Sequence, residues 1–427
     1  MRATWSRFIE MKSRSWAIPL AYALAALLFG FTVPRLVVAE LPDWISTISV
    51  DAAIGIYSSV ASGMIALTGI VFSLTFVMVQ FSATAYSPRL VLWISRDPVI
   101  SHSVGVFTAT FLYALAALAW VDRNGSGRVP LVGIAVIAVL LVLSIIMFIS
   151  LIQRVSMLQV TRMLIFTGDH GRKIIEKLYP PSDTPATPYS PGLLTAACIQ
   201  TLFHHGHPMT IQRLDVPALI GLATEASCAI EMTVSVGDPV LESTPMLRVI
   251  GATGARPIPE EALRSAIELG VERTFDQDPK YAIRLLVDIA IRALSPAIND
   301  PTTAVQALNE IEDLLLRLGR RRLEIGTYSD LSGKPRFLLH YPLWEDFLRL
   351  AFDEIRFYGA NSVQVMRRMN ALISELLSIL PEERCAALHY WQARLQSTVQ
   401  DTFSDKEDIL DASDEDRQGL GSSHRLS

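Results

Sequence analysis

Cysteine and charged residues are scarce in this sequence, and both shortages exclude classes of protein. The 427 residues include three cysteines, Cys198, Cys228 and Cys385, which lie far apart and lack CxxC spacing. They indicate neither a disulfide framework nor a zinc site, and free thiols suit a reducing cytosol. Charged residues make up 19% of the chain, and the net charge is −5. A nucleic-acid partner would require a basic face, so we expect none.

Catalytic signatures are missing as well. No GxSxG, Walker A, GxGxxG or HExxH motif occurs in its required context, which argues against an enzyme without excluding one. The cluster of His204, His205 and His207 could bind a metal ion, but it lacks a second HxxxH-type spacing. We interpret these histidines as part of a surface loop, and we expect neither a metal nor a cofactor.

Long hydrophobic runs are what the sequence has in abundance, since hydrophobic residues make up 51% of the chain. A helix of about 20 apolar residues crosses the hydrocarbon core of a bilayer. We therefore predict a transmembrane domain over residues 1–153 with four spanning helices, at 16–39, 52–80, 100–120 and 129–152. The lipid bilayer is accordingly an expected partner.

The distribution of arginine and lysine predicts how these helices are oriented. Basic residues occur before the first span, between the second and third spans, and after the fourth, whereas the loop 40–51 has none. Arg123 and Arg128 in the remaining loop weaken the contrast. Because cytoplasmic loops carry the excess of basic residues, we expect both termini in the cytoplasm. Everything beyond residue 153 is then cytosolic.

The second span carries a more specific pattern. It has no charged residue between 52 and 80, and small or hydroxylated residues recur in it at alternating spacings of four and three. This spacing places them on one seam of a helix. The seam comprises Gly55, Ser59, Ser62, Ala66, Gly69 and Ser73, and it continues to Gln80. Such a seam lets another helix pack closely or lines a water-filled path, and the sequence leaves both interpretations open.

Beyond the membrane we predict a cytosolic α+β part that is mostly helical. The fourth span continues as a helical stalk over 154–179, and a proline-rich linker follows at 180–191. Alternating apolar residues predict a small mixed β module over 192–258. A helical domain is predicted for 259–400 and a disordered acidic tail for 401–427. The individual helices are expected at 216–226, 262–273, 279–294, 301–318, 343–358, 362–379 and 382–399.

Two features of the helical domain are candidates for function. Arg284, Asp288 and Arg292 are spaced by four residues, so they form one charged stripe on the helix 279–294. Pro296 ends that helix, and Asp300 is then placed to cap the next one. This corner could hold an ion or a small polar ligand, or it could be a rigid turn held by capping alone. The candidate ligand residues are Ser295, Asn299, Asp300, Thr302 and Thr303, with Asp276 and Asp278 contributing from upstream.

The same stretch carries a family resemblance. The string ALSPAINDPTTAVQAL, preceded by RTFDQDPKYAIRLLVDIAIR, resembles the signature of a bacterial family of membrane proteins, the domain of unknown function 2254 family. VQFSATAYSPRL and FDEIRFYGANSVQVMRRM fit it too, so the resemblance covers most of residues 15–380. It implies a multi-pass protein of the bacterial inner membrane with a cytosolic C-terminal domain, and it implies no established activity.

Two functional hypotheses follow. In the first, the protein is a homo-oligomer that forms a pore or ion pathway, because four spans leave little room for a polar path within one subunit. The cytosolic domain would then gate or assemble the pore. In the second, the protein is a membrane-anchored sensor or scaffold that binds a ligand or partner at the corner around Asp300. In the pore hypothesis, Ser87, Pro88 and Arg89 after the second span are candidates for a coupling corner, with contact to lipid phosphates as the alternative.

Overall fold

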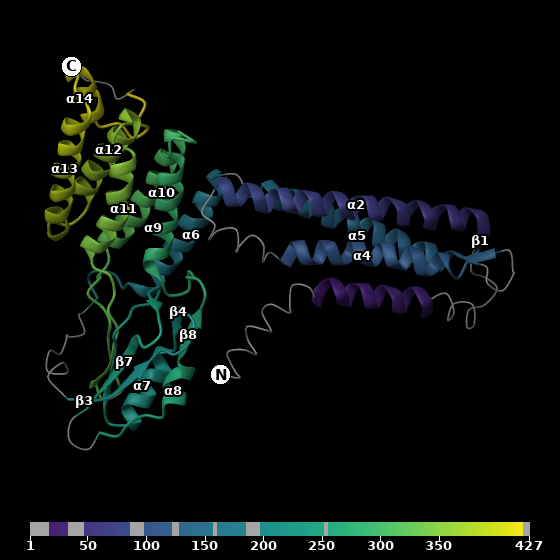
Figure 1. Cartoon of the computed structure of the whole chain (residues 1–427), viewed down its shortest axis with the longest axis horizontal. Helices are drawn as coiled ribbons and strands as arrows, with labels where there is room; N and C mark the ends of the chain where they lie inside the picture. Colours follow the sequence, from purple (N-terminus) through teal and green to yellow (C-terminus); the bar gives the residue numbers. More distant parts are fainter. Residues whose placement is uncertain are drawn as a thin grey trace. The chain divides into compact units, whose positions relative to one another are not determined.

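In the computed structural model, shown in Figure 1, the chain forms two units, Met1–Gln159 and Val160–Ser427. The structure describes residues 17–32, 47–85, 98–121, 128–156, 160–184, 197–251 and 255–421.

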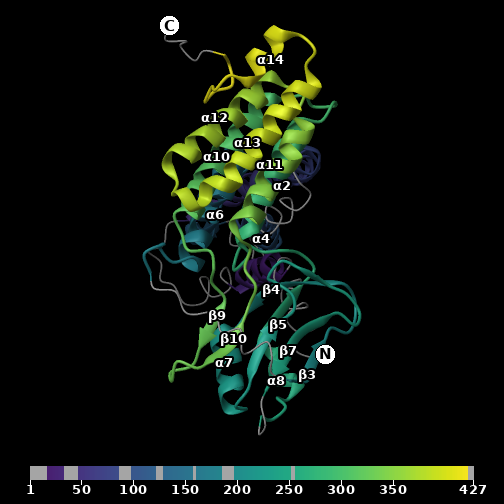
Figure 2. The ribbon, with the colours of Figure 1, turned by 90° about the vertical axis from the view of Figure 1, so that its left-hand side faces the viewer.

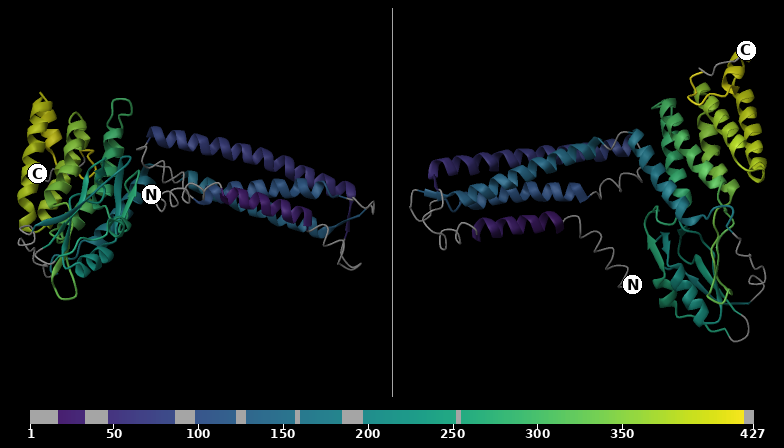
Figure 3. Two further views of the ribbon diagram at one scale, coloured as in Figure 1. Left: turned by 60° about the horizontal axis from the view of Figure 1, so that its bottom comes forward. Right: turned by 180° about the vertical axis from the view of Figure 1, so that it is seen from behind.

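The first unit consists of long apolar helices that run alongside one another (Figure 3). They are α2 (Val50–Ala85), α4 (Pro98–Leu118) and α5 (Leu131–Ser156). α4 packs against both α2 and α5. Each of the three contains a segment long and apolar enough to cross a membrane, namely Val50–Val77, Pro98–Leu118 and Leu131–Gln153. The chain is therefore a multi-pass membrane protein by length and composition of its helices.

Four spans were predicted, and three are supported. Within the predicted first span, the structure describes a shorter apolar helix, Ala17–Thr32. This helix packs closely on α4, because a Cβ atom added at Gly30 would lie 2.6 Å from the Cβ of Ala116. A Cβ atom added at Gly105 would lie equally close, at 2.6 Å, to the ring of Tyr22. At about 24 Å, sixteen helical residues are shorter than a hydrocarbon core of about 30 Å, so the count of four is not confirmed.

A short strand pair in the first unit was not predicted. β1 (Thr47–Ser49) pairs antiparallel with β2 (Arg128–Pro130). β1 immediately precedes α2, and β2 immediately precedes α5, so the pair ties together the starts of these two helices. Strands of three residues are too short to leave a period in the sequence.

Most helices of the second unit gather at one end, and its strands lie at the other end together with the helices at Val216–Glu225 and Glu260–Ser265 (Figure 2). The helices at the first end form a bundle of α6 (Val160–Leu178), α9 (Pro279–Ala293), α10 (Pro301–Gly319), α11 (Trp344–Tyr358), α12 (Val363–Ile379), α13 (Glu382–Thr402) and α14 (Lys406–Ser413). α9 packs against α6, α10 and α11, and α12 packs against α10, α13 and α14. Asp278, Asp300 and Ser362 cap the N-termini of α9, α10 and α12 with their side chains. These caps explain where the predicted helices begin.

The strands form two sheets. The larger has the order β3-β7-β5-β10-β9, in which β5 and β10 are parallel and the other neighbours are antiparallel. Its strands are β3 (Cys198–Phe203), β7 (Pro245–Ile250), β5 (Ala229–Met232), β10 (Pro335–Leu338) and β9 (Thr327–Ser329). The smaller sheet has the order β6-β4-β8, with β6 (Pro239–Val240), β4 (Met209–Leu214) and β8 (Ile267–Gly270). The helix α7 (Val216–Glu225) packs on β5 and β10, and the short helix α8 (Glu260–Ser265) packs on β8.

The β module draws on more of the chain than the predicted range 192–258. β8, β9 and β10 all follow that range in sequence, and β10 reaches β5 from beyond α9 and α10. The helix predicted at 262–273 is in fact α8 followed by β8. Pairing of β8 with β4 overrides the local helical pattern, because strand pairing depends on partners that are distant in sequence.

The predicted stalk and the predicted disordered tail both differ from the structure. α5 ends at Ser156, and α6 begins at Val160 as a member of the helical bundle. A Cβ atom added at Gly171 of α6 would lie within 2.9 Å of Leu314 and Ala282, so α6 approaches α9 and α10 closely. In the tail, α14 packs on α12 and α13 and is capped by Asp405. Asp411 of α14 pairs with Arg367 of α12 at 3.1 Å, whereas Glu407 and Asp408 are exposed.

Candidate functional site

The small-residue seam of α2, which we call the α2 seam, faces outward from the first unit. α2 buries a different face, through Ala53, Tyr57, Ala61, Met64 and Val71. The exposed residues include all six described members of the α2 seam, which are Gly55, Ser59, Ser62, Ala66, Gly69 and Ser73. Gln80 lies in α2 beyond them. A Cβ atom added at Gly55 or Gly69 would meet nothing within 4 Å. The seam is therefore unoccupied by the chain's own described helices.

The outward face of α5 has a different character. Its exposed side chains are large and apolar, among them Val139, Val142, Ile145 and Ile149. Such side chains suit lipid acyl chains, whereas a small-residue seam leaves a shallow groove in the helix surface. Phe72 and Phe76 are also exposed on α2, so its outward face combines bulky side chains with the groove.

The hydroxyl groups of the first unit differ in their hydrogen bonding according to whether they are buried or lie on the α2 seam. Inside it, the Oγ1 atom of Thr110 on α4 lies 3.0 Å from the Oγ atom of Ser144 on α5, and both residues are buried. On α2, Thr68 donates a hydrogen bond to a carbonyl of its own helix. Among the described residues, the hydroxyls of Ser59 and Ser62 have no hydrogen-bond partner. They are free to meet water or another chain.

The corner around Asp300 is a tightly capped turn. The Oδ1 atom of Asp300 accepts a hydrogen bond from the backbone N–H of Thr303 at 3.1 Å, and its Oδ2 atom accepts one from the Thr303 hydroxyl at 2.6 Å. The predicted N-cap is thereby confirmed. Asn299 is exposed and has a positive φ of 49°, and Ser295 accepts backbone bonds within the turn. Thr302 is exposed in the first turn of α10. Both Asp300 oxygens are used by the cap, and a ligand role for the corner stays a prediction.

The upstream carboxylates do not reach this corner, contrary to the prediction. Asp276 and Asp278 precede α9, and the corner follows it, so a helix about 21 Å long separates them. Asp276 is exposed. Asp278 is fully buried, caps α9 and pairs with Arg273 at 2.6 Å. Burial raises the pKa of the Asp278 carboxyl, while the neighbouring Arg273 acts in the opposite direction.

The charged stripe joins α9 to α11. The guanidinium of Arg284 lies 2.5 Å from the Asp288 carboxylate one turn along α9 and 2.7 Å from the Glu354 carboxylate on α11. Arg292, the third member, lies in the last turn of α9 and is half-buried. Arg284 and Asp288 therefore serve the packing of the bundle.

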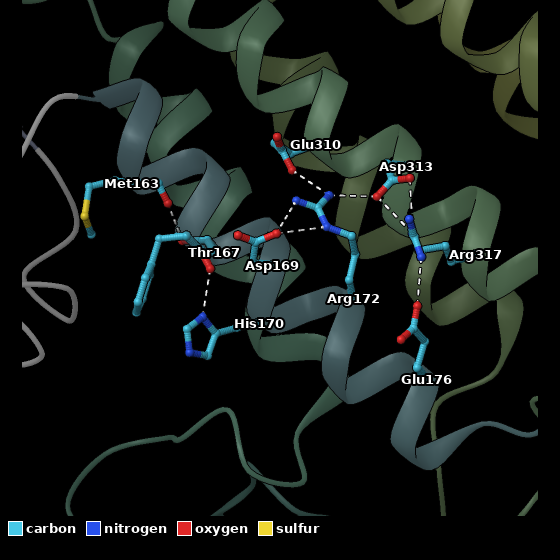
Figure 4. A network of polar contacts seen from close by, with 10 residues as sticks. Met163, Thr167, Asp169, His170, Arg172, Glu176, Glu310, Asp313 and Arg317 are labelled. Carbon is cyan, nitrogen blue, oxygen red and sulfur yellow. Dashed lines mark hydrogen bonds and ion pairs between the residues drawn. The ribbon is translucent and has the colours of Figure 1, made fainter. Parts of the chain in front are cut away.

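A network of ion pairs between α6 and α10 was not predicted (Figure 4). Its members are Asp169, Arg172 and Glu176 of α6 and Glu310, Asp313 and Arg317 of α10. Arg172 lies 3.0 Å from Glu310 and 2.7 Å from Asp313, and Arg317 bridges Asp313 and Glu176. The glycines of α6 are the sequence feature that could have indicated this close approach of α6 and α10. A Cβ atom at Gly168 would lie 2.0 Å from a carboxylate oxygen of Glu310.

Comparison with known proteins places this architecture in a family. The family described as "Predicted membrane protein (DUF2254)" matches residues 12–375. The chain belongs to this family. An uncharacterized protein of Mycobacterium bovis is 29% identical over 368 residues, which cover 83% of this chain and 69% of the relative. An uncharacterized protein of Mycobacterium tuberculosis matches with the same identity and coverage. No solved structure matches the chain.

Two further sites were predicted for this DUF2254 protein, the coupling corner after α2 and the histidine cluster. Ser87, Pro88 and Arg89 lie outside the described residues. In the histidine cluster, His204 is buried, and its Nε2 atom lies 2.9 Å from the carbonyl oxygen of His207. His205, on the surface, contacts Glu242. No group of three or more His, Cys, Asp or Glu side chains in the described ranges is arranged to hold a metal ion.

Proposed function

We propose that this protein is a homo-oligomer in the bacterial inner membrane, with copies meeting through the α2 seam around a polar path for ions. The observation that carries the proposal is the outward position of this seam. Small residues allow helices of different subunits to approach closely, and the exposed hydroxyls of Ser59 and Ser62 would contact water in the path. The apolar α5 would then face the lipid.

The interior of a single subunit supports the same conclusion. Buried hydroxyls there are paired in the contact between Thr110 and Ser144. The described spans carry no acidic or basic side chain at mid-length that could form a polar path within one chain. The exposed hydroxyls of the α2 seam would line the path, and several copies must surround that path to close it.

The second unit has a gating or assembly role in this proposal. α6 begins directly after the segment that follows α5 in sequence, and the Arg172 network attaches it to α10. Glycine contacts at Gly168 and Gly171 hold it close to the bundle. A rearrangement of the bundle would therefore move α6, which is the element nearest in sequence to the last span. We place both chain termini in the cytoplasm, on the side of this unit.

A sensor or scaffold that binds its ligand at the corner around Asp300 is the alternative. It is the weaker proposal, because the cap already uses both oxygens of the Asp300 carboxylate.

Ion conductance of the purified protein in planar bilayers tests the pore proposal. We expect discrete openings for the unmodified protein and their loss in the variant Ser59→Leu/Ser62→Leu, which fills the α2 seam. The matched control is Ser150→Leu on α5, where the serine hydroxyl donates to its own helix at 2.8 Å. This control should conduct normally. Absence of conductance in the unmodified protein, or normal conductance in the double variant, would overturn the proposal.

A further inference from the structure

A cleft in the second unit lies between α9, α11 and the segment that joins β10 to α11. Its volume is about 540 Å³, which is within the usual range for small-molecule sites. Its charged walls are formed by Lys280 and Arg284 of α9 and by Asp346, Arg349, Asp353 and Glu354 of α11. Ser235 and His340 also line the cleft, and the Ser235 hydroxyl donates to the carbonyl oxygen of His340 at 2.8 Å.

Two carboxylates of this cleft have cationic partners, whereas two of its cations form no ion pair with a described carboxylate. Glu354 pairs with Arg284, and the Oδ1 atom of Asp353 lies 3.4 Å from Arg356. In contrast, among the described residues neither Lys280 nor Arg349 has a carboxylate within ion-pair distance. The N–H groups of Lys280 and Arg349 are therefore available as donors to a phosphate or carboxylate of a ligand.

A second hollow adjoins the cleft and adds an aromatic surface. Its volume is about 490 Å³, and it shares Arg349 and Asp353 with the cleft. Tyr390 lies in it and is 57% exposed, so its side chain is accessible to a ligand. The guanidinium of Arg394 lies 5.9 Å from the centre of this ring. An aromatic ligand placed here would contact both a π face and a cation.

The boundary between the two hollows supplies an acceptor. Arg356 and Arg394 both approach the Oδ1 atom of Asp353, at 3.4 and 3.6 Å. Its Oδ2 atom is left to accept hydrogen bonds from the hydroxyl groups of a ligand. Along the surface, the cations Lys280 and Arg349 are therefore followed by the acceptor Asp353 and then by the aromatic ring of Tyr390.

We propose that these joined hollows bind a nucleotide. Lys280 and Arg349 hold its phosphates, Asp353 accepts hydrogen bonds from its ribose, and the base stacks on Tyr390. This site does not depend on the pore described above, and it lies away from the corner around Asp300. A bound nucleotide would bridge α9, α11 and α13, which carry these four side chains.

Equilibrium binding of ATP, adenosine and inorganic phosphate to the full-length protein in detergent tests this proposal. We expect ATP to bind more tightly than either fragment, because it alone engages both hollows. Lys280→Gln and Arg349→Gln should each weaken ATP binding about tenfold, the usual effect of losing one hydrogen bond to a charged group. Tyr390→Ala should weaken ATP and adenosine but leave phosphate binding unchanged.

Two matched controls keep the test specific. Lys334→Gln removes an exposed lysine on the turn before β10, outside the cleft, and should leave ATP binding unchanged. Tyr358→Ala does the same for an exposed tyrosine at the end of α11. The proposal is overturned if ATP does not bind, if ATP and phosphate bind equally well, or if the controls weaken ATP binding as much as the cleft variants do. Unchanged thermal unfolding of each variant shows that its effect is on binding.

Discussion

The ion pair between α10 and α12 gives the most quantitative prediction. Arg368 contacts Glu312 and donates from its Nε atom to Asn309 at 2.8 Å. The side chains of Arg368 and Glu312 are 3% and 11% exposed, so both charges are nearly removed from solvent. Replacing Arg368 by methionine keeps most of the volume but leaves the Glu312 carboxylate buried and unpaired. Loss of one partner from a buried pair costs about 3–5 kcal/mol.

Thermal unfolding of the full-length protein in detergent measures this cost. For a unit of this size, 1 kcal/mol corresponds to roughly 2–4 °C, so Arg368→Met should lower the Tm of the second unit by about 10 °C. The control is Arg417→Met, since Arg417 is 79% exposed and pairs with Glu375 at the surface. That pair should contribute about 0.5 kcal/mol or less.

Two further results decide whether the buried charge is the cause. Burial raises the pKa of Glu312, and Arg368 counteracts this effect. Without Arg368 the folded-state pKa rises further above the unfolded one, so the destabilisation should shrink at acidic pH, where Glu312 is protonated. The double variant Arg368→Met/Glu312→Leu should recover most of the lost stability. A Tm for Arg368→Met equal to that of Arg417→Met, or no recovery in the double variant, would refute the reasoning.

Three other predictions follow from the second unit. Asp300→Ala removes the cap of α10 and should cost about 1 kcal/mol, seen as a lower Tm and faster amide exchange at the start of α10, whereas Asp276→Ala should change neither. Arg172→Met leaves the carboxylate of Glu310 without its cation and should cost about 1–2 kcal/mol, measured by thermal unfolding; an unchanged Tm would contradict the role given to the network. Because the folded-state pKa of Asp278 is raised, its contribution is most favourable at low pH and is lost as pH rises through that pKa; Asp278→Asn should remove this dependence, and a variant with the same pH profile as the unmodified protein would contradict it.

The parts of the fold that depend on local sequence were predictable. The length and apolarity of α2, α4 and α5 are properties of single segments, and most helices of the second unit follow from their own apolar period and caps. The strands β8, β9 and β10 all lie in the range 259–400, which was predicted to be a helical domain. They are short, and their pairing depends on distant segments: β10 pairs with β5 across α9 and α10 in sequence, and β8 pairs with β4 across β5, β6 and β7. α14 was missed because its acidic composition outweighed one small buried face, at Ala412.

The same division applies to the candidate sites. The α2 seam and the Asp300 cap could be predicted from the sequence, because a fixed spacing places their residues on one helix face or in one turn. The direction in which the α2 seam faces could not be predicted, since it depends on how α2 packs on α4. The Arg172 network and the cleft at Lys280 and Arg349 bring together elements far apart in the chain. Each of their residues, taken alone, resembles an ordinary surface charge.

The subunit count of the purified protein, measured by native mass spectrometry in detergent, tests the central claim most directly. The outward α2 seam predicts a defined oligomer for the unmodified protein and for Ser150→Leu, and dissociation toward monomer for Ser59→Leu/Ser62→Leu. A monomer for the unmodified protein, or an intact oligomer for the double variant, would contradict the claim that copies of this chain meet through α2.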